Sequence, residues 1–181
     1  MLGADRGGRL VVLDCVGAIR LEKLLAELGS ECALHCAAER VERLRLRKLS
    51  LAESVYQVSA QHTHDTYATT HTHARTLPMA ESVSAYYHTT IVDLHGLSAS
   101  HLSRRNRAFL RRAFAFASTC YPETVHRIFL TRAPAGFSFL YKAIRPWLDP
   151  DTATKVQLLG TREARALLRP YGDEGRLGGR G

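Results

Sequence analysis

The sequence lacks the long apolar runs from which membrane-spanning helices are built. No hydrophobic stretch approaches the roughly 18 to 20 consecutive apolar residues that cross a bilayer. The first residues also lack the charged-then-apolar pattern of a secretory signal. Both absences favour a cytoplasmic location. The composition, with 45% hydrophobic and 23% charged residues over 181 positions, is that of one folded domain with a core of its own.

Cysteine is scarce and irregularly placed. The sequence holds four cysteines without the even spacing of a disulfide-rich fold. Cys32 and Cys36 lie one helical turn apart, yet no second pair of cysteines or histidines follows at the spacing of a zinc finger. We therefore expect buried free thiols at all four positions, Cys15, Cys32, Cys36 and Cys120.

Acidic residues are outnumbered by basic ones. Lysine and arginine total 25 against 17 acidic residues, which gives a net charge of +8. Such an excess calls for an acidic partner, either nucleic acid or anionic lipid. Five arginines crowd a helix that we predict from Leu97 to Thr119, namely Arg104, Arg105, Arg107, Arg111 and Arg112. A solvated helix face is the commoner role of such arginines, and contact with anionic headgroups is the alternative.

Motifs of catalysis and of nucleic-acid recognition are also missing. There is no Gly-x-Ser-x-Gly elbow, and Gly3, Gly7 and Gly8 precede a predicted strand, whereas a phosphate-binding loop follows one. No helix-turn-helix, zinc-finger or RNP-like signature is present, and aromatic residues do not interleave with the basic ones. We expect neither an enzyme nor a nucleic-acid-binding protein.

Hydrophobic patterns predict strands and helices in alternation. The predicted strands are residues 9–16, 86–94, 128–130 and 156–159. The predicted helices are residues 21–28, 31–50, 97–119, 137–148 and 161–169. Gly29 ends the first of them, Asp149 caps a turn that begins at Pro150, and Thr161 caps the last. This alternation predicts an α/β sandwich with a largely parallel sheet.

Residues 59–76 differ in composition from the rest of the chain. They are rich in threonine, histidine, serine and alanine and almost devoid of large aliphatic residues, so we expect no regular structure there. Two His-Thr-His triplets, His62 to His64 and His71 to His73, would each place two imidazoles on one face of an extended strand, where Zn²⁺ or Cu²⁺ can bind. Nothing in the segment holds such a geometry. We interpret it as an exposed insert without a metal site.

The segment from Phe137 to Leu148 has the pattern of an amphipathic helix. Its apolar residues recur at the i, i+3, i+4 and i+7 spacing of one helix face, namely Phe137, Leu140, Tyr141, Ile144, Trp147 and Leu148. The pattern alone favours packing against a core. A mobile lid over an apolar pocket is the alternative.

Several short motifs follow one another in a specific order. They are Asp5–Val11, Thr90–Ser98, Tyr121–Glu123, Ala133–Ser138, Leu148–Thr152, Leu159–Gly160 and Leu177–Arg180. This succession resembles the CRAL-TRIO lipid-binding domain, and within it the cytosolic phosphatidylinositol/phosphatidylcholine transfer proteins. The resemblance covers one domain at residues 5–180, interrupted by the insert at about 50–76. The family's N-terminal helical lobe is absent from it, and Leu10 stands where the family usually has proline.

The resemblance implies a CRAL-TRIO-like sandwich, in which helices cover a largely parallel sheet and a mobile gate helix closes an apolar pocket. Phe137–Leu148 would be the gate, with hinges at Gly136 and at the Asp149-Pro150 turn. The pocket would hold one phosphatidylinositol or phosphatidylcholine and transfer it between or to cytosolic membrane surfaces, without catalysis and without a cofactor. The implied lipid contacts are Thr119, Phe137, Ser138, Leu140, Tyr141, Ile144, Asp151 and Arg180. Thr119, Asp151 and Arg180 would meet the headgroup.

Two other functions stay open at this point. One is a phosphoinositide sensor or scaffold that docks on membranes through its arginines and transfers nothing. The other is a truncated fragment without function. For the transfer protein and the sensor alike, the expected partners are phospholipid and an anionic membrane surface, met by a cytoplasmic, peripherally attached monomer. An apolar pocket would also accept a retinoid or a tocopherol, so the identity of the lipid stays open too.

Overall fold

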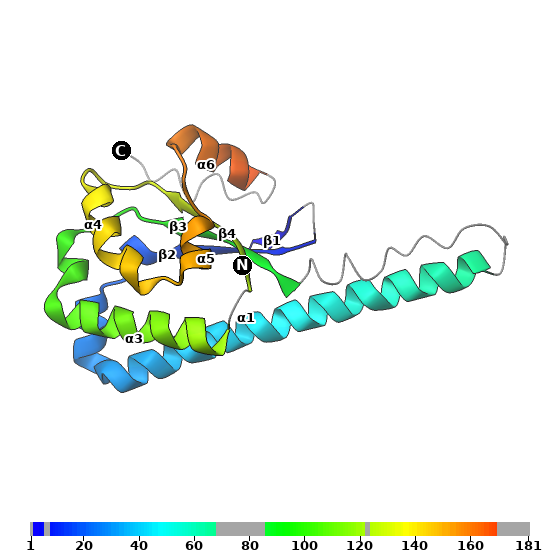
Figure 1. Cartoon of the computed structure of the whole chain (residues 1–181), viewed down its shortest axis with the longest axis horizontal. Helices are drawn as coiled ribbons and strands as arrows, with labels where there is room; N and C mark the ends of the chain where they lie inside the picture. Colours follow the sequence, from blue (N-terminus) through cyan, green and yellow to red (C-terminus); the bar gives the residue numbers. More distant parts are fainter. Residues whose placement is uncertain (1, 6–7, 68–85, 122–123, 170–181) are drawn as a thin grey trace.

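The chain folds around a five-stranded sheet whose strands lie in chain order, β1-β2-β3-β4-β5. The computed structural model (Figure 1) describes residues 2–5, 8–67, 86–121 and 124–169. The strands are β1 (Gly3–Ala4), β2 (Leu10–Cys15), β3 (His88–Asp93), β4 (Val125–Thr131) and β5 (Val156–Leu158). β1 is antiparallel to β2, and all other neighbours are parallel. The predicted α/β fold with a largely parallel sheet is confirmed.

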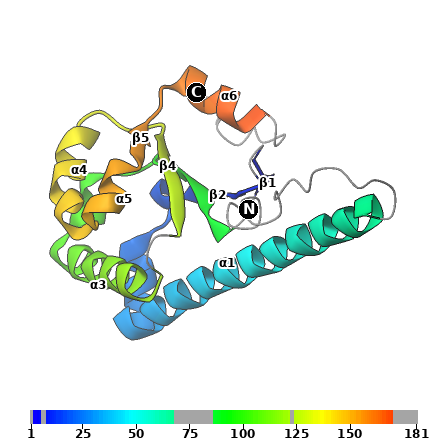
Figure 2. The same cartoon turned by 45° about the vertical axis from the view of Figure 1, so that its right-hand side comes forward.

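Helices fill the connections between the strands and cover both faces of the sheet. The α-helices are α1 (Leu21–Tyr67), α3 (Arg104–Cys120), α4 (Phe137–Ile144), α5 (Pro150–Thr154) and α6 (Thr161–Leu168). The described residues also form the short 3-10 helices η1 (Val16–Ala18), η2 (Ala99–Leu102) and η3 (Arg145–Trp147). Figures 1 and 2 show α6 on one face of the sheet and α1 and α3 side by side on the other. Coverage of both faces is what a parallel sheet requires.

Side chains that alternate along the strands build a core on each face of the sheet. Val11 and Ile91 pack with Leu168 of α6, and Ile91 and Leu168 are fully buried. Leu130 belongs to the opposite face and packs with Phe137 at the start of α4. Burying each of these side chains contributes about 1.5–3 kcal/mol, so the two clusters hold the helices to the sheet.

Helix α1 changes direction at Gly29. The backbone there has φ 75° and ψ 164°, a region that is open almost only to glycine. Leu25 and Ala33, on the two sides of the break, both pack against Phe109 of α3. The predicted end of the first helix at Gly29 is confirmed, and the packing on α3 explains why the helix resumes at once.

The expectation of an irregular segment at residues 59–76 is wrong for its first half. Helix α1 continues to Tyr67, past the last residue that we had expected to be helical. Once a helix is nucleated by packing, each further residue adds a hydrogen bond at little cost, so a polar sequence can extend it. Residues 68–76, with His71 and His73, lie outside the described residues, as do the side chains of His62 and His64.

The predicted helix at 97–119 is two separate elements. Residues 99–102 form η2, and α3 begins only at Arg104, where Ser103 caps it by accepting a hydrogen bond from the backbone N–H of Asn106 (3.4 Å). Serine side chains compete with the helical backbone for hydrogen bonds, which is why they favour such boundaries.

Two of the five arginines on α3 fasten it to α1. Arg105 donates from Nη2 to the backbone carbonyl of Leu25 (2.6 Å). Arg112 forms a two-pronged ion pair with Glu31, with N–O distances of 2.7 and 3.0 Å. All five are exposed, and Arg104, Arg107 and Arg111 form no described contact with α1. The arginine-rich face therefore has a structural part and a solvent-facing part.

The predicted boundaries of the last helices are partly right. Asp149 caps α5 as predicted, accepting a hydrogen bond from the backbone N–H of Thr152 (2.8 Å). The predicted helix at 137–148 stops earlier, because Pro146 in η3 has no N–H to continue the α-helical ladder. The cap of α6 is Gly160 and not Thr161, and the Glu163 side chain accepts the N–H of Gly160 (2.9 Å).

The cysteines are free but exposed, so the expectation of buried thiols is wrong. Cys32 and Cys36 share the solvent face of α1, while Ala33 takes the buried position against α3. A four-residue spacing puts two residues on one helix face without saying which face is covered.

Candidate functional site

One face of the sheet carries polar side chains at its centre. The register pairs Val12 of β2 with Thr90 of β3, and Thr90 with Ile128 of β4. Because side chains alternate with a period of two, Asp14 and His88 lie on this same face. The opposite face, which α6 covers, takes the apolar residues of the first core cluster. The polar face is the floor of the cavity described below.

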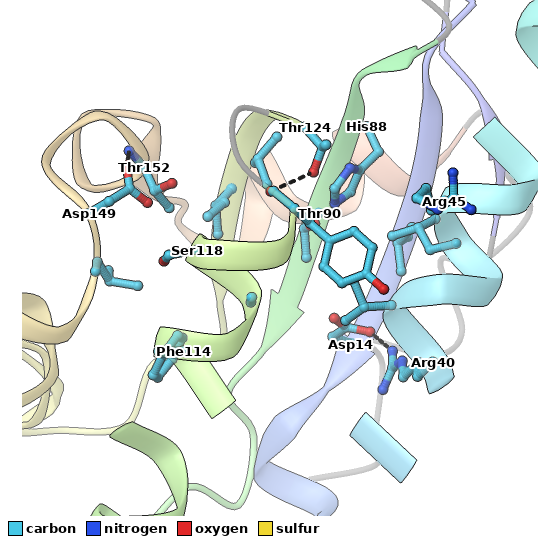
Figure 3. A pocket seen from close by; sticks show the side chains of 18 of the residues that line it. Asp14, Arg40, Arg45, His88, Thr90, Phe114, Ser118, Thr124, Asp149 and Thr152 are labelled. Carbon is cyan, nitrogen blue, oxygen red and sulfur yellow. Dashed lines mark hydrogen bonds and ion pairs between the residues drawn. The ribbon is translucent and has the colours of Figure 1, made fainter. Parts of the chain in front are cut away.

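A cavity of about 690 Å³ lies between this floor and the helices α1 and α3 (Figure 3). Its walls are Ala37, Arg40, Val41, Leu44, Arg45 and Lys48 of α1, Phe114, Ala117 and Ser118 of α3, and Tyr121, Thr124, Val125, Leu148, Asp149, Asp151 and Thr152 nearby. The volume falls within the roughly 300–1,000 Å³ of small-molecule sites. The lining mixes apolar and charged groups, which suits an amphipathic ligand.

Most charges at the cavity are paired within the protein. Asp14 forms an ion pair with Arg40. Glu42 accepts hydrogen bonds from Arg45 (2.6 Å from Nη2) and from the Tyr121 hydroxyl (2.8 Å). The hydrogen bond from Arg45, followed by that from Tyr121, lowers the pKa of Glu42 to about 2. These contacts tie α1 to the end of α3 and keep that wall of the cavity in place.

Lys48 and His88 are the buried ionisable groups of the cavity. Burial, and then the positive charge of Arg45, lowers the pKa of Lys48 to about 8. Burial, and then the positive charge of Lys48, lowers the pKa of His88 to about 4, while the backbone at Thr124 acts in the opposite direction. Both groups are held in surroundings that disfavour their charged forms.

The low pKa of His88 predicts a loss of stability in mild acid. Its pKa is 6.5 when exposed and about 4 in the fold, so the unfolded chain binds the proton more readily. The free energy of unfolding should therefore fall by up to about 3 kcal/mol as the pH drops from 6.5 to 4. Urea unfolding at several pH values measures this slope. His88→Asn should flatten the dependence of the unfolding free energy on pH. His95→Asn, at an exposed position, should leave this dependence unchanged. The same pH dependence in both variants would contradict the burial of a neutral His88.

The structure brings few of the predicted lipid contacts to the cavity. Asp151 lines it and pairs with Lys155. Thr119 is exposed on α3, beside Ser118, which does line the cavity. Arg180 lies outside the described residues.

The predicted contacts on α4 lie apart from the cavity lining. Phe137 is buried, and its ring stacks on that of Tyr141 with centroids 5.9 Å apart. Leu140 and Tyr141 cover the same cluster, Ile144 is half-buried and Ser138 is exposed. Of the whole segment 137–148, only Leu148 lines the cavity.

Sequence reasoning missed Lys48, His88 and Ser118. The alternation of side chains along β3 puts His88 and Thr90 on the same face of the sheet. The sequence does not show which face borders the cavity. Ser118 adjoins a residue that was predicted. No sequence pattern indicated the burial of Lys48, because it depends on how α1 crosses the sheet.

Neither a membrane-spanning helix nor a metal cluster is found within the described part of the chain. None of the helices there combines the length and the apolarity that a bilayer crossing needs. The same residues contain no group of three or more His, Cys, Asp or Glu side chains in reach of one ion.

Comparison with known proteins identifies the family. The family model of the CRAL/TRIO domain matches residues 1–177. This chain belongs to the CRAL/TRIO domain family. The match covers all the residues that line the cavity, so the cavity lies within the matched domain.

Curated relatives align with part of this CRAL/TRIO chain. The phosphatidylinositol/phosphatidylcholine transfer protein SFH11 of Arabidopsis thaliana is 39% identical over 80 residues, which are 44% of this chain and 21% of that protein. The SEC14 cytosolic factor of Kluyveromyces lactis is 35% identical over 80 residues, 44% of this chain and 26% of that protein. The aligned part thus spans about a quarter or less of these relatives.

A solved structure gives a weaker match. The crystal structure of Sfh5 is 19% identical, covers 45% of this chain and 32% of that one, and superposes with a TM-score of 0.39.

Proposed function

We propose that this CRAL/TRIO chain binds one phosphatidylinositol or phosphatidylcholine and transfers it between cytosolic membrane surfaces, as a carrier and not as an enzyme. The observation that carries the proposal is the cavity of about 690 Å³ on the polar face of the sheet, inside a domain of this family. The names of the relatives, which are phosphatidylinositol/phosphatidylcholine transfer proteins, support the choice of lipid.

The acyl chains need an apolar surface next to the cavity. Each CH₂ group taken from a bilayer must be buried again, at about 0.8 kcal/mol. Ile128 lines the cavity and also packs against the apolar cluster beneath α4, which includes Leu130 and Phe137. A shift of α4 away from the sheet would join this cluster to the cavity and extend it with apolar surface.

The gate therefore remains part of the proposal, with α4 and η3 as the moving segment. Phe137, Leu140, Tyr141 and Ile144 would meet the acyl chains once α4 has moved. Thr119, Ser138, Asp151 and Arg180 stay proposed as polar contacts of the lipid. Phe139 of α4 is 77% exposed and would enter the membrane surface, to which the exposed arginines of α3 would be attracted.

Ile144→Glu tests the gate. The change puts a negative charge on the half-buried side of α4, where it would face the acyl chains. Lipid uptake should therefore fall about ten-fold or more, which corresponds to about 1.4 kcal/mol of binding free energy. Uptake is measured with fluorescent phosphatidylcholine from donor vesicles. Lys142→Glu, at an exposed position on the same helix, is the matched control. A folded Ile144→Glu variant with full uptake would mean that α4 is no gate.

Transfer between vesicles tests the function itself. Donor vesicles contain labelled phosphatidylinositol or phosphatidylcholine, and unlabelled acceptor vesicles are separated from them after incubation with the protein. We expect label to appear in the acceptors in proportion to the protein added. A sensor or scaffold would instead bind acidic vesicles and move no label, and that result would replace the proposed function.

A further inference from the structure

Two free thiols lie one helical turn apart on the solvent side of α1. Cys32 and Cys36 are both exposed, and neither is bonded to another cysteine. Neither of them lines the cavity to which we assign the lipid. At a four-residue spacing, the two Cβ atoms lie on the same helix face, about 5–6 Å apart. Two accessible sulfur atoms on one face are donors that a single soft metal ion can bridge.

Contacts with α3 hold this turn of α1 in place. Glu31, directly before Cys32, forms the two-pronged ion pair with Arg112 of α3. Ala33, directly after Cys32, is buried in the cluster that includes Phe109 of α3. Figures 1 and 2 show α1 and α3 side by side. Because the turn is already fixed, the two sulfur atoms need little ordering to bind an ion.

The spacing is too long for a disulfide within the helix. A disulfide brings its two Cβ atoms to about 3.8 Å from each other. The Cβ atoms of Cys32 and Cys36 would therefore have to approach by roughly 1–2 Å. That movement would distort the turn that Glu31 and Ala33 fasten to α3. The pair therefore stays a dithiol while the native helix is intact.

A bridging metal ion suits the same spacing. A zinc–thiolate bond is about 2.3 Å long, and one ion between two thiolates at such bond lengths separates the sulfur atoms by up to about 4.6 Å. Sulfur atoms attached to Cβ atoms about 5–6 Å apart reach this separation by rotation about χ1. The backbone of α1 does not have to move.

The number of ligands decides which ion the pair can hold. In the described part of the chain, no group of three or more His, Cys, Asp or Glu side chains can hold one ion. Zn²⁺ takes three or four protein ligands, so two thiolates are too few for it. Cu(I) is soft, prefers thiolate sulfur and forms linear complexes with two thiolates. The neighbouring carboxylates, Glu31 and Glu39, are hard oxygen donors and are paired with Arg112 and Arg43.

We propose that Cys32 and Cys36 bind one Cu(I) ion as a two-coordinate dithiolate on the surface of α1. Each thiol releases its proton to solvent as its Cu–S bond forms, so one bound Cu(I) frees two protons and the complex carries one net negative charge. Copper remains Cu(I), and no electron is transferred. The site uses neither the cavity nor a lipid, so it does not rest on the proposed function.

Titration of the complete 181-residue chain with Cu(I) tests the site. Reduced protein competes with a chromogenic Cu(I) chelator in the absence of oxygen, and the absorbance of the chelator reports the copper that the protein takes. We expect one tightly bound Cu(I) per chain. Cys36→Ser should weaken its binding about ten-fold or more, because one of the two Cu–S bonds is lost. Cys15→Ser/Cys120→Ser removes the two thiols outside the pair and should keep the full affinity.

A relocated thiol separates the spacing from the number of cysteines. Cys36→Ala/Ala38→Cys keeps four thiols but turns the second one about 120° around the helix from Cys32. Its affinity for Cu(I) should fall as far as that of Cys36→Ser. Circular dichroism and urea unfolding confirm that both variants are folded. X-ray absorption of the loaded native chain should show two sulfur neighbours of copper.

Three results would overturn the proposal. Equal affinity in the native chain, Cys36→Ser and the relocated variant would assign the copper to adventitious contacts. A loss of affinity in Cys15→Ser/Cys120→Ser would place the ion at another thiol. One Cu(I) per two chains, in a dimer on size-exclusion chromatography, would mean that the ion joins two molecules. None of these results touches the proposed function, because the vesicle transfer assay contains no copper.

Discussion

Replacing Asp93 with alanine is expected to lower the free energy of unfolding by about 3–5 kcal/mol, the usual effect of removing one partner from a buried ion pair. The Asp93 side chain is 5% exposed and that of its partner Arg132 is 15% exposed. Arg132 donates from Nε to Asp93 (2.8 Å), and the backbone N–H of His95 donates to the same carboxylate (3.0 Å). The variant removes the carboxylate that a partly buried guanidinium and a backbone donor contact.

The position of this pair in the fold adds to the effect. Asp93 ends β3 and Arg132 follows β4, so their contact ties the carboxyl ends of two central strands together. Arg132 has a φ of 51°, a conformation that non-glycine residues rarely adopt and that surrounding contacts must maintain. Without Asp93, nothing described on β3 would replace the carboxylate that the guanidinium now meets.

Urea unfolding of the wild type and two variants measures the loss. Glu31→Ala is the control, because it removes the acid of another arginine pair whose Glu31 side chain is 80% exposed. Exposed pairs contribute little to stability, so this control should unfold close to the wild type. Equal, small effects of Asp93→Ala and Glu31→Ala would show that burial does not strengthen the Asp93–Arg132 contact.

Ser118→Trp is expected to reduce lipid uptake to below one tenth of the wild-type level. Ser118 lines the cavity from α3, so an indole at this position would occupy the space that we assign to the ligand. A displaced ligand cannot regain its contacts elsewhere, and a ten-fold loss corresponds to about 1.4 kcal/mol of binding free energy. Equilibrium uptake from phosphatidylcholine vesicles is the measurement, with thermal unfolding to confirm that the variant is folded.

Two matched variants decide what the loss means. Ala115→Trp adds the same side chain at an exposed position on α3 and should keep its uptake. Thr119→Trp tests the headgroup contact that the resemblance assigns to Thr119. The structure leaves this residue exposed beside the cavity. Full uptake by a folded Ser118→Trp variant would mean that the lipid is held elsewhere.

Four strands of the five-stranded sheet and the break in α1 could be predicted because local chemistry decides them, whereas the two-residue strand β1 was not predicted. The apolar run at residues 9–16 becomes β2, and Gly29 is the residue that its backbone conformation demands. The early end of α4 was also readable, since Pro146 cannot donate the next helical hydrogen bond. The apolar spacing continues past Pro146, and the prediction at 137–148 was therefore too long.

The exposure of side chains could not be read from the same patterns. Cys32 and Ala33 are adjacent small residues of one helix, and only the position of α3 makes one exposed and the other buried. Lys48 is a still clearer case, because lysine is almost always exposed and its burial arises where α1 crosses the floor of the cavity. Tertiary packing therefore decides which charged residues line the cavity.

The resemblance to the family predicted the fold class, whereas the lipid contacts that it implies stay predictions. The family is confirmed, and so is the largely parallel sheet that the resemblance implies. Of the eight predicted lipid contacts, however, Asp151 is the one that lines the cavity among the described residues. The contacts on α4 depend on a movement that a single conformation does not display.

Native mass spectrometry of the purified chain detects a bound lipid by its mass. We expect a 1:1 complex with phosphatidylinositol or phosphatidylcholine, either carried through purification or formed after incubation with vesicles of those lipids. The same complex should be missing from Ser118→Trp and present in Ala115→Trp. A chain that unfolds cooperatively, and therefore is folded, yet carries no lipid after both treatments would contradict the claim.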